Sequence, residues 1–327
     1  MNKNLFLPTS VLNDIRRTAI NLIEEKILQG FKRKASCNFD FSLQSTDIDQ
    51  SSNIASLQNQ GFKNISSKNS SPTKALLLNI LNTEYDYSKL KRFDKIYVPL
   101  KYFSDKKYEN VLKILEKKSK LYIYMPVVVK DRFLTKIESM VKNALQNNKI
   151  SGAVVSEISS ISIFKDKIIN EVNVKDKYKT SSIITEENFE LIANYNFNIF
   201  NSFSASKVEN FGFSTVTLSP ELSANELSEI KLKNKEVIVY GKIPLMTMSY
   251  CLLGKSNRCY KDCNHLCLED TKYFLSDRYS FKFRVIPDNT QTLTTIYNSR
   301  NLSVSNVNAD CIRFDILDET IDEINNL

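Results

Sequence analysis

Short apolar runs rich in β-branched and aromatic residues recur through the middle of the chain. Most are uninterrupted rather than alternating, which is typical of strands buried on both faces of a sheet. Apolar strands of this kind, separated by helical intervals, predict a parallel sheet covered by helices. The predicted strands are ALLLNI (75–80), KIYVPL (95–100), LYIYMPVVV (121–129), GAVVSEI (152–158), FNIF (197–200), STVTL (214–218) and EVIVY (236–240).

Two of the intervals, 133–147 and 222–232, show the three- and four-residue spacing of amphipathic helices, and Ser223 is placed to cap the second. No glycine-rich phosphate loop follows any predicted strand, so a dinucleotide-binding doubly wound sheet has no support. The predicted fold class is therefore α/β, with a parallel (β/α) barrel-like domain, complete or partial.

The pattern divides the chain into four segments. Residues 1–35 contain one amphipathic helix, and 36–74, rich in Ser, Asn and Gln, are predicted to be a flexible linker. The barrel-like domain takes 75–250. A cysteine-containing appendage, 251–327, follows, with two short strands around Asp277-Arg278 and another strand and a helix start after Asp310.

Composition adds little to this picture. The chain is 42% hydrophobic and 25% charged, as ordinary globular proteins are. The longest apolar run is too short to span a bilayer, and the N-terminus lacks a secretory signal, so we expect a cytoplasmic protein without a membrane partner. The net charge of +8 is compatible with RNA or DNA as a partner, whereas the dispersed lysines favour an ordinary solvated surface.

Reactive groups in parallel β/α folds gather after the carboxyl ends of strands, which singles out two candidate catalytic residues. Asn201 follows FNIF, and Glu221 follows STVTLSP. The alternative for Glu221 is an acidic residue in the first turn of the next helix, where the helix dipole stabilises it.

Four cysteines within 17 residues form the strongest candidate for a metal site: Cys251, Cys259, Cys263 and Cys267. Four thiolates satisfy either a [4Fe–4S] cluster or a tetrahedral zinc ion. Residues four apart share one side of a helix, so the last three can converge while Cys251 closes the site. The alternative is that no metal binds and the thiols pack as small apolar side chains.

Several short stretches resemble one known family. The C-terminal part of bacterial members of peptidase family U32, often labelled collagenase-like proteases, is similar to SPEL (219–222), IPLMTMSYC (243–251), the Cys259/Cys263 pair, YFLSDR (273–278) and IYNSRNL (296–302). A segment in the middle of longer members is similar to LFLPTSVLNDIRRTAINLIEE (5–25).

The resemblance has two departures. Nothing in this chain corresponds to the N-terminal barrel half of the longer members, which a separate chain would have to supply. The fourth cysteine of the family pattern is replaced by Thr292, with Leu293 in place of the arginine that follows it, and Cys267 is an extra cysteine that can serve as the fourth ligand.

The resemblance implies either a peptidase or an iron–sulfur-dependent enzyme that takes part in hydroxylation of tRNA, rRNA or ubiquinone precursors. The single histidine, His265, lies among the cysteines, so neither a Cys–His pair nor a serine triad has an obvious base. We therefore expect RNA hydroxylation rather than true proteolysis, with RNA or a protein or peptide as the substrate. The alternative is a non-catalytic or split remnant that acts as a binding subunit.

Overall fold

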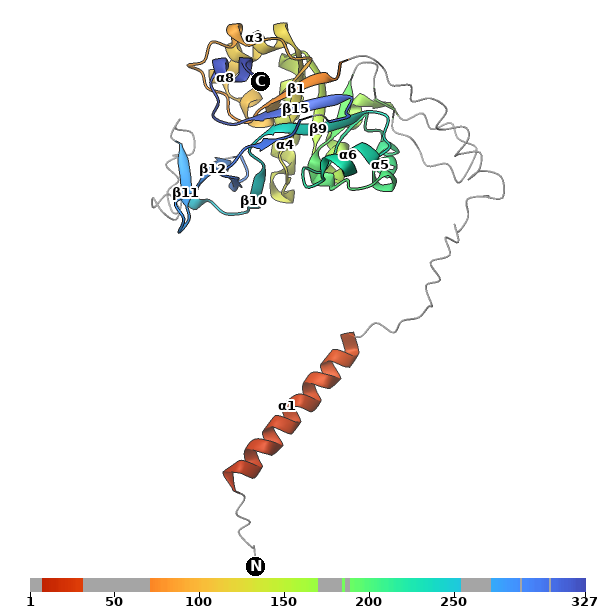
Figure 1. Ribbon diagram of the computed structural model, residues 1–327, viewed down its shortest axis with the longest axis vertical. Coiled ribbons are helices and arrows are strands. Elements are labelled where there is room, and N and C mark those ends of the chain that lie inside the picture. Colours follow the sequence, from red (N-terminus) through yellow and green to blue (C-terminus); the bar gives the residue numbers. More distant parts are fainter. Residues whose placement is uncertain are drawn as a thin grey trace, which may run out of the picture. The chain divides into compact units, whose positions relative to one another are not determined.

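Figure 1 shows the computed structural model, which describes residues 8–31, 71–169, 184–185, 189–253, 272–288, 290–305 and 307–327. The chain forms two units, Met1–Asn69 and Ser70–Leu327. The described part of the first unit is one helix, α1 (Thr9–Phe31), which confirms the predicted N-terminal helix. Of the predicted linker, 36–70 lie outside the described residues, and Thr73 and Lys74 belong to the first strand of the second unit.

The second unit is built on a closed barrel of eight parallel strands, so the predicted fold class is confirmed and the barrel is complete. The strands follow one another around the barrel in chain order, and β8–β9 and β15–β1 pairing closes it. They are β1 (Thr73–Leu78), β2 (Lys95–Pro99), β3 (Lys120–Tyr124), β4 (Ile150–Val155), β7 (Glu190–Ala193), β8 (Thr215–Thr217), β9 (Lys235–Gly241) and β15 (Cys311–Ile316).

Helices cover the outside of the barrel, where the side chains of one face of each strand meet them in a continuous apolar layer. The predicted amphipathic helices are both present, and Ser223 caps the second through a capping box with Glu226. The α-helices are α3 (Glu109–Lys118), α4 (Leu134–Asn147), α5 (Ser202–Glu209), α6 (Ala224–Glu229) and α8 (Ile321–Asn325).

Two strands differ from the sequence-based expectation. The fifth strand is Glu190–Ala193, not FNIF (197–200), because Tyr195–Phe197 turn as a short 3-10 helix and Asn198 takes a left-handed φ of 51°. The eighth strand comes from Cys311–Ile316, so the barrel is completed from outside the 75–250 range.

A four-stranded antiparallel sheet is inserted between β9 and β15 (Figure 1). Its order is β10 (Pro244–Met248), β13 (Leu293–Tyr297), β12 (Lys282–Asp288) and β11 (Tyr273–Ser276), and the predicted strand pair around Asp277-Arg278 is β11–β12. The chain then returns along β9 through β14 (Leu302–Ser303). A separate two-stranded ribbon joins β5 (Ile168–Ile169) and β6 (Ile184–Thr185).

The barrel interior is polar as well as apolar. Arg313 is fully buried and pairs in a bidentate fashion with Asp315, at 2.6 and 2.8 Å. The same guanidinium donates to Asn194 on the opposite wall at 2.9 Å and lies 3.6 Å from Glu236. Burial alone would lower the pKa of Arg313, but the neighbouring Asp315, Tyr124 and Glu236 together more than offset this and hold the pKa above its usual value.

Glu236 is the second centre of this interior network. Its carboxylate accepts hydrogen bonds from the Tyr97 hydroxyl at 2.6 Å, from Thr217 at 2.8 Å and from the Cys311 thiol at 3.3 Å. Burial raises the pKa of Cys311 and the adjacent carboxylate raises it further, so the thiol stays protonated and can donate. Because β2 and β9 are not neighbours, the Tyr97–Glu236 bond crosses the interior and ties opposite walls together.

Among the described residues, no helix is long and apolar enough to cross a membrane.

Candidate functional site

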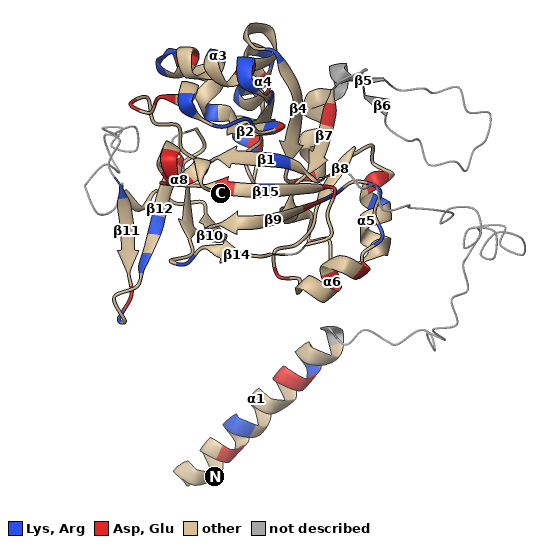
Figure 2. Ribbon diagram, turned by 45° about the horizontal axis from the view of Figure 1, so that its top comes forward, with Lys and Arg blue, Asp and Glu red and all other residues tan. Residues whose placement is uncertain are grey.

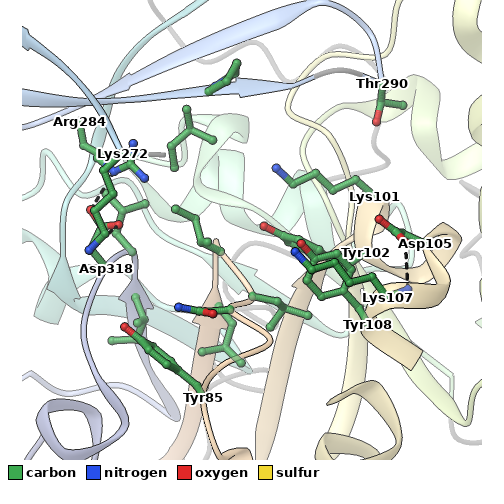
Figure 3. Close-up of a pocket in the computed structure, with 18 of the residues that line it drawn as sticks. Tyr85, Lys101, Tyr102, Asp105, Lys107, Tyr108, Lys272, Arg284, Thr290 and Asp318 are labelled. Carbon is green, nitrogen blue, oxygen red and sulfur yellow. Dashed lines mark hydrogen bonds and ion pairs between the residues drawn. The ribbon is translucent and has the colours of Figure 1, made fainter. Parts of the chain in front are cut away.

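A cavity of about 510 Å³ opens at the carboxyl ends of β1, β2 and β15, on the side of the barrel where the antiparallel sheet is inserted. The barrel contributes one wall through the segments that follow these strands, and β11 and β12 contribute the opposite wall (Figure 3). A volume of this size is typical of sites for small molecules or for one unit of a polymer. The cavity therefore lies where parallel β/α barrels place their reactive groups.

Five cationic side chains line the cavity. Lys101 and Lys107 come from the segment after β2, Lys136 from α4, and Lys272 and Arg284 from the inserted sheet. The Lys101 ammonium lies 5.0 Å from the centre of the Tyr102 ring, and the Lys136 ammonium donates to a backbone carbonyl across the cavity, that of Thr290, at 3.2 Å. Positive charge therefore faces the cavity from both of its walls.

The three carboxylates of the lining are already engaged. Asp105 caps the short helix Lys106–Tyr108 by accepting from Lys107 N at 2.9 Å. Asp318 accepts from Arg284 at 2.8 Å and lies 3.6 Å from Lys272 (Figure 3). Glu319 accepts from its own loop at Leu317 N, at 2.7 Å, and from the Tyr240 hydroxyl, at 3.1 Å. Five cations against three occupied carboxylates leave the cavity with net positive charge.

Tyrosine rings form the remaining notable part of the lining. Tyr102 and Tyr108 pack edge to face with ring centres 4.7 Å apart, and Tyr85 lies on the opposite side of the cavity floor (Figure 3). Tyr87 completes the group, and burial raises the pKa of its hydroxyl to about 12. Tyr87 and Tyr102 are buried, whereas Tyr85 and Tyr108 are half-buried and can offer part of their rings beside the ammonium groups, an arrangement suited to an aromatic ligand that carries negative charge.

The inserted sheet is held on the barrel by buried polar contacts near the cavity. Gln291 is fully buried, and it accepts from Lys130 N at 2.8 Å and donates to Val128 O at 2.9 Å in the loop after β3. On the other side, the Tyr297 hydroxyl donates to Asn79 Oδ1 at 3.3 Å, directly after β1. The wall formed by the sheet is thus fixed at two points.

Neither predicted catalytic residue lines this cavity. Asn201 caps α5, where its side chain accepts from Ser204 N at 2.9 Å. Glu221 lies on the exposed turn between β8 and α6, three residues before that helix begins, with its backbone N–H donating to the Ser219 hydroxyl at 3.4 Å. The two side chains therefore occupy helix-capping and loop positions at the carboxyl ends of later strands.

Of the predicted metal ligands, Cys259, Cys263 and Cys267 lie outside the described residues. Cys251 is described and is half-buried, three residues after β10 ends. Met248 pairs with Thr294, and Thr294 Oγ1 donates to Tyr250 O at 2.7 Å, one residue before Cys251.

Sequence reasoning missed the cavity residues and the interior ion pair. A signal for the pair was present, because CIRFDI places Arg313 and Asp315 at alternate positions of an otherwise apolar strand, on one face. A signal for the cavity was weaker. Lys101, Tyr102 and Tyr108 follow a predicted strand, but Lys272 and Arg284 come from a segment about 170 residues away that no local pattern connects to them.

The fold and the cavity define a parallel α/β barrel protein with a cationic, tyrosine-lined cavity at the carboxyl ends of its strands. Comparisons with known protein families, with curated proteins and with solved structures found no match.

Proposed function

We propose that this protein is an RNA-acting barrel enzyme of the U32 type, in which the cavity binds one nucleotide unit of the substrate. The observation that carries the proposal is the combination of net positive charge with tyrosine rings, of which Tyr85 and Tyr108 are half-buried, in a cavity of nucleotide size. Lysine and arginine neutralise phosphate groups, and a tyrosine ring stacks on any base. A neutral peptide would use neither feature, which favours RNA over a peptide substrate.

The cavity suggests how a nucleotide would lie. Lys101 and Lys107 stand on one wall, beside the rings of Tyr102 and Tyr108, so a phosphate and a base can be bound side by side. On the other wall, the buried Arg284 donates to Asp318 and to the carbonyls of Tyr273 and Val285, and these contacts fix the direction of its guanidinium group. A phosphate group can therefore meet positive charge from either wall.

The cysteine site is a part of the same proposal. We propose that Cys251, Cys259, Cys263 and Cys267 hold a [4Fe–4S] cluster, with zinc as the alternative. Cys251 is half-buried three residues after β10 ends, and in this proposal it closes the site. An iron–sulfur cluster would supply electron transfer for a hydroxylation reaction.

One observation favours a second function, that of a non-catalytic binding subunit. All three carboxylates of the cavity lining are occupied by backbone N–H groups, cations or a tyrosine hydroxyl, so none of them is available as a general base. In that case a separate chain would supply the catalytic groups. Binding of RNA is common to both functions, and turnover by the isolated chain separates them.

Substitutions in the cavity test RNA binding. We expect Lys101→Glu to weaken binding of a short single-stranded RNA about tenfold or more and to lower the salt dependence by about one phosphate contact. Tyr108→Ala removes a stacking face and should weaken binding by about 1–3 kcal/mol. The measurement is fluorescence anisotropy of a labelled RNA at several salt concentrations.

Lys207→Glu on α5 is the matched control, because it makes the same charge change at an exposed site that does not line the cavity. It should lower affinity only slightly. Equal losses in Lys101→Glu and Lys207→Glu would show that binding follows overall charge and would contradict a site in the cavity.

A further inference from the structure

We infer that the β11–β12 hairpin, residues 272–288, is an RNA-binding arm that carries single-stranded RNA to the cavity. The inference rests on the proposed function and extends it, because the arm is a separate surface whose tip lies outside the cavity lining. Figure 2 shows the hairpin at the edge of the inserted sheet, with its turn projecting away from the barrel and basic residues along it.

The tip of the hairpin is a fixed turn. Asp277 Oδ1 accepts from Tyr279 N at 2.8 Å and from Phe281 N at 2.9 Å. The Asp277 backbone also bonds to Phe281 and to Ser280, and Ser280 takes a left-handed φ of 65° that closes the turn. Side chains presented by such a turn lose little conformational entropy when they bind a partner.

The turn presents aromatic rings to solvent. Tyr279 is 66% exposed, and Phe281 and Phe274 are also exposed. Rings of this size are costly to leave in water unless a partner covers them. An exposed cluster of aromatic rings of this kind is typical of an interaction surface.

Each ring has a guanidinium group beside it. The Arg278 group lies 4.7 Å from the centre of the Tyr279 ring, and the Arg300 group lies 5.3 Å from that of Phe281. Closer to the barrel, the Arg284 group lies 5.4 Å from the Phe274 ring. Arginine next to an aromatic face is the arrangement that holds a stacked base together with its phosphate.

The charge of the arm selects an anionic partner rather than another apolar surface. Lys272, Arg278, Lys282 and Arg284 stand against two acidic residues, Asp277 and Asp288. Both acidic side chains serve the backbone, since Asp277 caps the turn and Asp288 accepts from Thr290 N at 2.9 Å. Arg278 and Lys282 therefore meet the solvent, whereas Arg284 is buried and, like Lys272, pairs with Asp318.

The arm is continuous with the cavity. Lys272, Tyr273 and Arg284 belong to it and also line the cavity, while the tip lies three to five residues further along the strands, or about 10–17 Å. RNA stacked on the tip would thus reach the cavity with only a few nucleotides between. A single nucleotide bound in the cavity would not touch the tip at all.

The inference is tested by comparing an RNA long enough to reach from the cavity to the tip with a single nucleotide. Binding of a single-stranded RNA of about 12 nucleotides and of uridine monophosphate is measured by fluorescence anisotropy and by calorimetry for wild type, Tyr279→Ala, Arg278→Ala and the control Phe203→Ala. Phe203 is 86% exposed on α5 and is not part of the arm. We expect Tyr279→Ala and Arg278→Ala to weaken binding of the 12-mer about 5- to 50-fold, with uridine monophosphate and the control unchanged.

Three results would overturn the inference. Wild-type affinity for the 12-mer in both arm variants would reject the arm and leave the proposed function standing. Failure of the wild type to bind either RNA probe would reject both. Loss of self-association in the arm variants, seen by light scattering with RNA affinity unchanged, would identify the arm as a contact between copies of the chain.

Discussion

Replacing Asp315 with alanine is expected to lower the free energy of unfolding by about 3–5 kcal/mol. The substitution leaves the Arg313 guanidinium fully buried, with Glu236 at 3.6 Å as its nearest remaining carboxylate. A buried charge without its partner loses the attraction that offset its desolvation, and Arg313 cannot shed its proton to escape that cost. Urea unfolding followed by circular dichroism measures the loss.

The control is Asp322→Ala, which makes the same chemical change at an exposed position in the first turn of α8. It should cost no more than about 1 kcal/mol, the usual range for a helix-dipole contact. A loss of less than about 1 kcal/mol in Asp315→Ala would contradict the role given to the interior network, since it would mean that water or another group takes the place of Asp315.

Anaerobically purified protein is expected to contain about four iron and four sulfide per chain, and Cys259→Ser is expected to lose nearly all of both. Removing one thiolate from a four-ligand site leaves an iron atom without its protein ligand, which makes the cluster labile. Colorimetric iron and sulfide assays, with zinc determined by mass spectrometry on the same samples, provide the measurement.

Cys37→Ser serves as the control for this experiment, because Cys37 is distant in sequence from the four predicted ligands. Its iron content should equal that of the wild type. Stoichiometric zinc without iron would show that the site binds zinc instead of an iron–sulfur cluster. Metal-free protein in which all four thiols are alkylated would reject the metal site altogether.

The regular part of the fold could be predicted from the sequence because buried parallel strands leave continuous apolar runs. The runs at 75–80, 95–100 and 236–240 correspond to β1, β2 and β9 in this way. The fifth strand was misplaced because two short apolar runs lie close together, and only the left-handed Asn198 decides that the second one turns. The eighth strand was recognised as a strand, but its place beside β1 depends on a pairing over 237 residues.

The candidate site could be predicted from the sequence much less completely than the fold. Glu221 and Asn201 were selected by their position after predicted strands, and that rule locates the correct end of the barrel without saying which loops enclose a cavity. The cavity needs the inserted sheet as a wall, so Lys272 and Arg284 become site residues only through tertiary structure. The positive charge of the cavity could not be predicted from the sequence either, because the lysines are dispersed along the chain and come together only in the folded protein.

The central claim is that RNA binds in the cavity at the carboxyl ends of the strands. Photochemical cross-linking of an RNA containing 4-thiouridine, followed by mass spectrometry of the peptides, tests it most directly. The account predicts cross-links to the segment that contains Tyr102 and Tyr108, which line the cavity next to Lys101 and Lys107. Cross-links confined to surfaces away from this segment and from the β11–β12 hairpin, or none above the background of an unrelated basic protein, would contradict it.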